Sequence, residues 1–205
     1  LAGVMMISAL GCQKAPPPSP SISVSDPSVD VALAQTALEE GEVDKAAQRA
    51  WTIVQAHPKR LDARLVLSSA NVLQGRHQEA LDHADYALTI DPDNADAHTN
   101  RGAALMALSR EADALKALEA ALERDSEHQG ALRNAARLHG EAKSWLAERA
   151  LLERLARLRP DDAEVRLLLA RNRSVTGDMK AARRAIDQAI ERAPDNPALH
   201  TFAAT

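Results

Sequence analysis

The chain has 205 residues, a formal net charge of −4 and 45% hydrophobic residues, which fits one soluble domain or one repeat array. A charge so close to neutrality argues against a general nucleic-acid-binding protein. Aromatic residues make up only 2% of the chain, so a core must be built from alanine and leucine, which favour helices. A single cysteine excludes an internal disulfide.

The first eleven residues, LAGVMMISALG, are apolar and uncharged. They are too few to span a bilayer as a helix, which takes about 20 residues, but they match the apolar region of a secretory signal peptide. Neither an initiating Met nor a Lys or Arg precedes them. We therefore interpret residues 1–11 as an incomplete signal peptide, or one whose non-Met start codon was read as Leu1.

The end of this run and the residue after it, Ala9, Leu10, Gly11 and Cys12, resemble the lipobox of bacterial lipoproteins. Gly11 and Cys12 fit that pattern, whereas Ala9 stands where Leu is usual and Leu10 where Ala or Ser is usual. The resemblance implies lipidation of Cys12, cleavage before it, and, because Gln13 rather than Asp follows, anchoring to the outer membrane facing the periplasm. The alternative is that Cys12 is an incidental thiol in an ordinary signal peptide.

Residues 12–26 would then form a tether between the lipid and the folded part of the chain. This stretch is rich in Pro and Ser, and prolines favour the extended polyproline II conformation. At about 3.1 Å per residue, it could hold a domain up to about 40 Å from the membrane surface.

From residue 27 onward the sequence has a 34-residue period, carried by Pro58, Pro92, Pro160 and Pro194 and by Gly41, Gly75 and Gly177. Counted from Pro27, repeats begin at 27, 61, 95, 129, 163 and 197 without insertions. A fixed period of this length predicts a stacked array of helix pairs. The glycines would supply the turn within each pair, and the prolines would end the second helix. Phase 34 holds N-cap residues: Asp26, Asn94, Asp162 and Asn196.

Small residues recur at the eighth and twentieth positions, where two helices must approach closely: Ala34, Ser68, Gly102, Ala136 and Ala170, then Ala46, Ala80, Ala114 and Ala182. With these positions, residues 27–205 resemble the tetratricopeptide-repeat (TPR) family. The resemblance implies an all-α fold, a right-handed α–α superhelix of five full repeats plus the first helix of a sixth.

Two departures from the family pattern stand out. The large aromatic residue usual at the fourth position is replaced, as by Arg64, His98 and Arg166, which we expect to weaken packing locally. The fourth repeat is the most divergent, with Lys143 in place of Gly and Glu148 in place of Ala.

The sequence contains no phosphate-binding loop, no nucleophile elbow and no HExxH motif, and its seven histidines are scattered. We therefore predict no catalytic residue, no metal site and no cofactor. The expected function is binding of a protein or peptide partner.

The TPR resemblance implies a concave groove lined by the first helix of each repeat. Its expected residues are apolar near the tether, at Val31, Leu65 and Val72, and polar or basic further on, at Asn100, Arg133, Asn134, Arg137 and Arg171. Net charge changes along the chain from −8 in residues 27–128 to +4 in residues 129–205. We expect a partner segment with apolar and acidic parts, its acidic part near the arginines, unless these are solvated or paired with Glu141 and Glu164.

These features favour a non-enzymatic scaffold, lipid-anchored in the bacterial envelope, that assists assembly of a pilus, secretion or other envelope complex. The alternatives are a soluble or inner-membrane TPR adaptor, or a fragment of a larger TPR-containing protein or enzyme. The expected organisation is a signal peptide at 1–11, a lipidated tether at 12–26 and a TPR domain at 27–205.

Overall fold

The computed structural model describes residues 26–192 and 194. Within this part the chain forms ten α-helices: α1 (Pro27–Glu39), α2 (Val43–Ala56), α3 (Leu61–Leu73), α4 (His77–Ile90), α5 (Ala95–Ala107), α6 (Glu111–Arg124), α7 (Gln129–Glu141), α8 (Trp145–Leu158), α9 (Ala163–Val175) and α10 (Met179–Arg192). The first helices of the five pairs begin at 27, 61, 95, 129 and 163. The sixth repeat start, Cys12 and the predicted tether as far as residue 25 lie outside the described residues.

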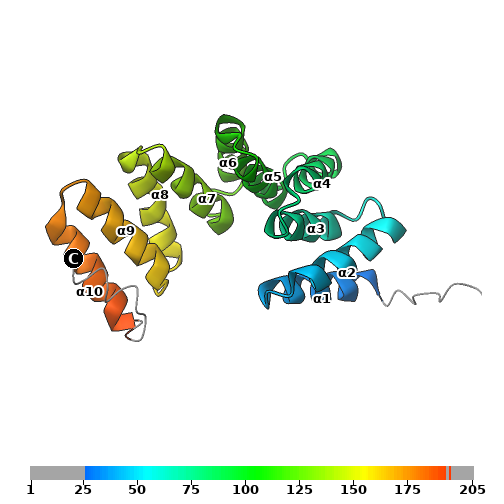
Figure 1. The fold of residues 1–205 in the computed structure, drawn as a ribbon, viewed down its shortest axis with the longest axis horizontal. Coiled ribbons are helices and arrows are strands. Elements are labelled where there is room, and N and C mark those ends of the chain that lie inside the picture. Colours follow the sequence, from blue (N-terminus) through cyan, green and yellow to red (C-terminus); the bar gives the residue numbers. More distant parts are fainter. Residues whose placement is uncertain (1–25, 193, 195–205) are drawn as a thin grey trace, which may run out of the picture.

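The ten helices form five antiparallel pairs that stack along a curved path, with α1 and α10 at opposite ends (Figure 1). Each helix packs on the next in sequence, and the first helix of a pair also packs on the first helix of the next pair from α1 through α7. This is the predicted TPR solenoid.

The turn inside each helix pair requires a residue in the left-handed conformation. Gly41, Gly75 and Gly177 have φ of +78°, +76° and +85°, as predicted from their shared position in the repeat. The equivalent residues of the third and fourth pairs, Ser109 and Lys143, adopt φ of +58° and +56°. The turn geometry therefore persists where glycine is absent, at a conformational cost.

Replacing Lys143 by glycine should accordingly stabilise the protein by about 1 kcal/mol, because glycine adopts positive φ without a clash of its own Cβ. Urea unfolding followed by circular dichroism measures the gain. Lys143→Ala is the matched control, since it removes the same side chain but keeps the Cβ. Equal stabilities for the glycine and alanine variants would contradict the strain argument.

The helix starts are also capped as predicted. The side chains of Asp26, Asn94 and Asp162 accept hydrogen bonds from backbone N–H groups in the first turns of α1, α5 and α9. At the start of α7, His128 takes this role, with Nδ1 accepting from the N–H of Ala131 at 3.1 Å. The predicted cap Asn196 lies outside the described part of the chain.

The core is built from small aliphatic side chains, as the composition predicts. The eighth and twentieth positions are in close contact within a pair: the Ser68 hydroxyl donates to the Ala80 carbonyl at 2.8 Å, and both residues are fully buried. At Gly102, an added Cβ would lie 2.7 Å from the Leu118 side chain. Alanine, serine and glycine thus allow helix spacings that larger residues would prevent.

The polar residues at the fourth position form hydrogen bonds with the turn before their helix. In three repeats the side chain reaches back to the carbonyl of the preceding proline: Arg64 Nε donates to Pro58 at 2.7 Å, Arg166 Nη2 to Pro160 at 2.6 Å, and His98 Nε2 lies 2.8 Å from the Pro92 oxygen. These bonds tie the start of each first helix to the turn before it. Hydrogen-bonded polar side chains therefore occupy the position that an aromatic ring has in the TPR pattern.

Candidate functional site

A cavity of about 550 Å³ opens between α7, α8 and α9. Its walls come from α7 and α9, and α8 contributes its floor. The lining residues are Arg133, Asn134, Ala136, Arg137, Gly140 and Glu141 on α7, Trp145, Glu148 and Leu152 on α8, and Glu164, Leu168 and Arg171 on α9. Four residues predicted for the groove, Arg133, Asn134, Arg137 and Arg171, therefore lie around one cavity.

The cavity forms where the stacking of the solenoid changes. In the described part of the chain, α7 and α9 lack the close contact that joins the first helices of the preceding pairs. Instead of the alanine found at the twentieth position of other repeats, α8 carries Glu148, which extends toward α7. An added Cβ on Gly140 would lie 2.7 Å from Glu148 Oε1, so a larger residue there would displace this carboxylate from its position.

A buried amide fixes the floor of the cavity. Asn172 of α9 is 1% exposed, and its Nδ2 donates to the Trp145 carbonyl at 2.8 Å and to Glu148 Oε2 at 2.7 Å. Its Oδ1 accepts from Arg149 Nε at 3.1 Å. Asn172 thus links α8 to α9 and holds the Glu148 carboxylate in place.

Arg133 is occupied by carboxylates of the chain itself. Its Nη1 lies 2.6 Å from Glu164 Oε2, and its Nη2 lies 3.1 Å from Asp162 Oδ2. The alternative considered for the arginines, pairing with Glu164, is therefore found at Arg133. Arg133 thus links α7 to the start of α9 through ion pairs with the Asp162 and Glu164 carboxylates.

Arg137 and Arg171 have no carboxylate partner in the described part of the chain. Within that part, the only polar contact of the Arg137 side chain is with Met106 Sδ, at 3.7 Å. Arg171 and Glu141 form no hydrogen bond or ion pair with a described residue, and all three side chains are exposed. Two guanidiniums at one cavity can bind carboxylates in bidentate geometry, while the half-buried Trp145 and Leu168 offer apolar surface beside them.

The residues predicted for the other half of the groove have different surroundings. Val31 is 3% exposed and packs in the core between α1, α2 and α3, so it offers no surface to a partner. Leu65 and Val72 are half-buried on α3. Asn100 joins α5 to α3, because its Nδ2 donates to the Leu65 carbonyl at 2.9 Å and its Oδ1 accepts from the Ser69 hydroxyl at 3.2 Å.

Sequence reasoning missed the α8 contribution to the site, Trp145, Glu148 and Leu152. Glu148 and Lys143 were visible as departures from the repeat pattern. The glutamate at position 148, where other repeats have alanine, would have indicated the cavity if we had interpreted it as a local change in helix spacing.

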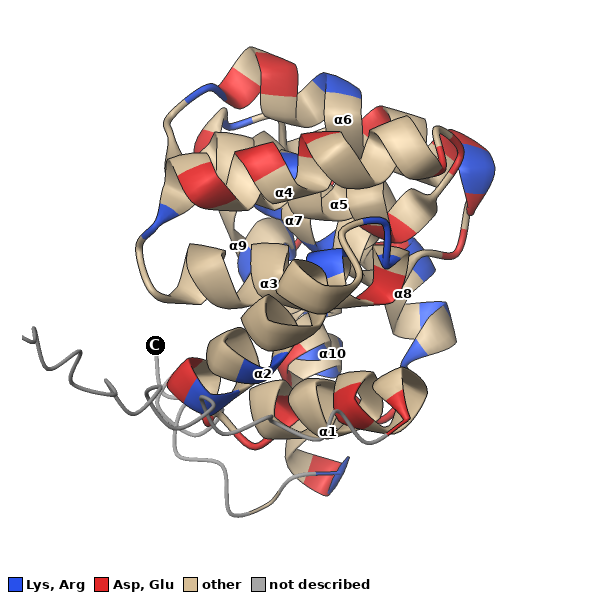
Figure 2. Ribbon diagram, turned by 90° about the vertical axis from the view of Figure 1, so that its right-hand side faces the viewer, with Lys and Arg blue, Asp and Glu red and all other residues tan. Residues whose placement is uncertain are grey.

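Charge is distributed unevenly over the solenoid, as the sequence indicates. Acidic residues stand out on α4 and α6 in the ribbon (Figure 2), whereas basic residues are more frequent from α8 onward in the sequence. The cavity lies in the basic half, and its own lining contains three arginines and three glutamates.

Among the described residues, no three or more His, Cys, Asp or Glu side chains are arranged to hold a metal ion. Within the same residues, no helix combines the length and the apolar character needed to cross a membrane.

Structures of other proteins share this arrangement. TTC0263 from Thermus thermophilus, described as a thermophilic TPR protein, matches with a TM-score of 0.74 at 18% identity over 87% of this chain and 97% of its own. PilW, described as a type IV pilus biogenesis factor, matches with a TM-score of 0.72 at 21% identity over 83% and 79%. YrrB, described as a TPR protein with an unusual peptide-binding site, matches with a TM-score of 0.62 at 16% identity over 86% and 91%.

At these identities the similarity concerns the fold alone. No curated protein is significantly similar in sequence. Family models described as tetratricopeptide repeat match residues 31–95 in one case and residues 71–135 and 147–205 in the other, which together cover most of the chain. The chain therefore belongs to the tetratricopeptide-repeat family, whose members bind peptide or protein partners.

Proposed function

We propose that this protein is a non-enzymatic scaffold that binds an acidic and apolar segment of a partner protein at the cavity between α7, α8 and α9. The observation that carries the proposal is the exposure of Arg137 and Arg171, without carboxylate partners among the described residues, beside the half-buried apolar side chains of Trp145 and Leu168. Unpaired guanidiniums in the same cavity as Trp145 and Leu168 suit a ligand that brings both a carboxylate and an aliphatic side chain.

The carboxylates of the cavity restrict the ligand further. Glu164 is held by Arg133, and Glu148 by Asn172, so neither is free to pair with Arg137 or Arg171. Glu141 is exposed at the C-terminal end of α7, one turn beyond Arg137, and would repel a second acidic group there. The favoured ligand is therefore a segment with acidic residues near Arg137 and Arg171 and a neutral or basic residue near Glu141.

Trp145 allows a direct test. In the Trp51→Phe protein, Trp145 is the single tryptophan. A capped ten-residue peptide of alternating leucine and glutamate should change its fluorescence in a saturable and salt-sensitive way, and the leucine–lysine peptide should not. Arg137→Glu with Arg171→Glu should weaken binding by about 1–3 kcal/mol, which is about 5- to 150-fold, and reduce the salt dependence.

The matched control is Arg157→Glu with Arg184→Glu, which changes the net charge equally at two exposed arginines of α8 and α10 that do not line the cavity. This control should retain most of the affinity. Equal losses in the two double variants would assign the effect to overall charge, and unchanged affinity in the first would remove the cavity from the mechanism.

We further propose that the scaffold is anchored by lipid at Cys12 to the outer membrane, facing the periplasm, where it assists assembly of a pilus, secretion or other envelope complex. The lipobox-like sequence before Cys12 and the fold shared with a type IV pilus biogenesis factor support this proposal. In bacterial membranes, Cys12→Ser should move the protein to the soluble fraction after a salt wash, and the mass of the native protein should include acyl chains. A Cys12→Ser protein that still sediments would refute the anchor.

A further inference from the structure

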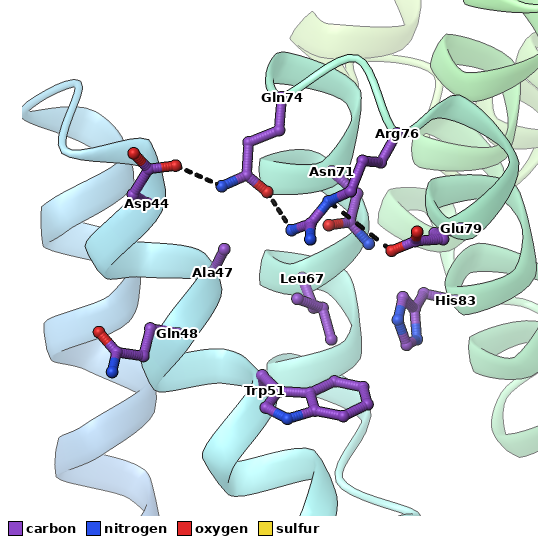
Figure 3. A pocket seen from close by; sticks show the side chains of 10 residues that line it. All are labelled: Asp44, Ala47, Gln48, Trp51, Leu67, Asn71, Gln74, Arg76, Glu79 and His83. Atoms are coloured by element: carbon purple, nitrogen blue, oxygen red, sulfur yellow. Dashed lines mark hydrogen bonds and ion pairs between the residues drawn. The ribbon is translucent and has the colours of Figure 1, made fainter.

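A second cavity, of about 390 Å³, lies between α2, α3 and α4, two repeats away from the proposed peptide site (Figure 3). It is lined by Asp44, Ala47, Gln48 and Trp51 of α2, Leu67 and Asn71 of α3, Gln74 and Arg76 of the connecting turn, and Glu79 and His83 of α4. Most of these residues belong to second helices or to the turn before one, and none occupies a repeat position expected to face the groove. The cavity is therefore separate from the site proposed above.

The charged residues at one end of this cavity already have partners. Gln74 Nε2 donates to Asp44 Oδ1 at 2.6 Å, Arg76 donates to the Gln74 oxygen, and Arg76 Nε lies 3.6 Å from Glu79 Oε2 (Figure 3). These bonds form a continuous series across the rim. Each carboxylate of the rim has a polar partner in the chain itself, for which a ligand would have to compete.

The interior contains a carboxamide without a partner. Asn71 is 1% exposed, and its side chain forms no hydrogen bond with any described residue; Oδ1 in particular is buried and unpaired. Leaving such a group unpaired in the interior is costly. Because the torsion next to a terminal amide is broad and roughly two-fold, a rotation of about half a turn exchanges the oxygen and the nitrogen that face a ligand in the cavity.

His83 supplies a hydrogen-bonding group on the facing helix. Arg64 Nη1 lies 3.2 Å from His83 Nδ1, and because a guanidinium can only donate, Nδ1 accepts and the ring proton resides on Nε2. Burial, followed by the positive charge of Arg64, holds the pKa of His83 below its ordinary value, which favours the neutral ring. No described residue accepts a hydrogen bond from Nε2.

The remaining wall is apolar, with Trp51 exposed and Leu67 and Ala47 buried behind it. The Trp51 side chain is 51% exposed, although tryptophan is usually well buried, and it lies near Leu67 in the same view (Figure 3). Ala47 lies further along the same wall. A short aliphatic stem could pack here and carry a polar group to Asn71 and His83.

We propose that this cavity binds the carboxamide side chain of a glutamine or asparagine from a partner peptide, with its stem against Trp51 and its amide paired with Asn71. A carboxamide is neutral, and it offers both a donor and an acceptor to the unpaired amide of Asn71. A carboxylate would be buried near Asp44 and Glu79, and an ammonium near Arg64 and Arg76, so both charged side chains are disfavoured. The protein would then carry two recognition sites, one basic and one neutral, on different repeats.

The test uses the full chain with Trp145→Phe, in which Trp51 is the only tryptophan and reports this cavity alone. The probes are N-acetylglutamine methylamide and its glutamate and lysine counterparts. The glutamine probe should change Trp51 fluorescence in a saturable way, and the charged probes should bind at least about tenfold more weakly. In the Trp51→Phe protein, the same titration should leave Trp145 unaffected, which separates this site from the groove.

Asn71→Leu in the Trp145→Phe background should abolish the preference for glutamine, whereas Gln55→Leu, which removes an exposed amide of α2 outside the cavity, should preserve it. If Asn71→Leu does not fold, the side-chain amide signals of Asn71 in the native protein provide the same test by NMR, because glutamine should shift them and glutamate should not. A non-saturable response, equal affinity for the three probes, or unshifted Asn71 signals would overturn the proposal. The peptide titration at Trp145 is unaffected by any of these outcomes.

Discussion

Replacing Arg64 by alanine should destabilise the protein by about 3 kcal/mol, a large effect for a residue at a position where the repeat pattern predicts an aromatic side chain. Arg64 is only 9% exposed. Its guanidinium carbon lies 3.6 Å from the centroid of the Tyr86 ring, and its Nε donates to the Pro58 carbonyl at 2.7 Å. Alanine would remove the cation–π contact, leave the carbonyl without this donor and create a cavity beneath Tyr86.

Urea unfolding measures this loss, and Arg166→Ala is its internal comparison. Arg166 occupies the same repeat position and also donates to a proline carbonyl, but it is more exposed. Its guanidinium also donates to Gln188, and because these bonds compete with water at a partly exposed site, we expect a contribution of about 1 kcal/mol. Equal losses at the two sites would mean that the burial of Arg64 and its contact with Tyr86 add nothing.

The same variant has a second readout at His83. The charge of Arg64 contributes, after burial, to the lowered pKa of His83, so the pKa should rise in Arg64→Ala. NMR titration of the histidine ring protons measures it. An unchanged His83 pKa would contradict the proposed contact between the guanidinium and Nδ1.

Much of the fold could be predicted because its signals are local. Proline and glycine at fixed spacing restrict backbone torsions directly, so Pro58 and Gly75 indicate helix ends without knowledge of their neighbours. The role of Arg64 could not be predicted in this way. Its burial depends on Tyr86 in the next helix and on the Pro58 carbonyl, and the sequence pattern places neither beside it.

The candidate site could be predicted only in part for the same reason. The repeat positions grouped Arg133, Arg137 and Arg171, and these residues do lie around one cavity. The pattern does not decide which arginine is already paired, because Asp162 and Glu164 approach Arg133 only through stacking of the next repeat. The pattern also does not show that Val31 is buried by the adjacent helices and so does not face the groove.

Asn172→Leu should destabilise the protein by about 3 kcal/mol, because it removes three hydrogen bonds, one of them to a carboxylate, from a fully enclosed position. The Glu148 carboxylate would lose its buried donor, and Arg149 Nε would lose its acceptor. Leucine fills a similar volume, so most of the loss comes from hydrogen bonding rather than from a cavity. Urea unfolding measures the change, and Trp145 fluorescence reports the floor of the peptide cavity directly.

Combining Asn172→Leu with Glu148→Ala tests the cause of that loss. Glu148→Ala restores the residue type found at this position in other repeats and removes the carboxylate that Asn172 holds. The double variant should therefore lose about 1–2 kcal/mol less unfolding free energy than the sum of the losses in the two single variants. Strictly additive effects would show that Asn172 and Glu148 act independently. A measured coupling would show that the cavity between α7 and α9 depends on the buried amide of Asn172, which holds the Glu148 carboxylate at a position where other repeats have alanine.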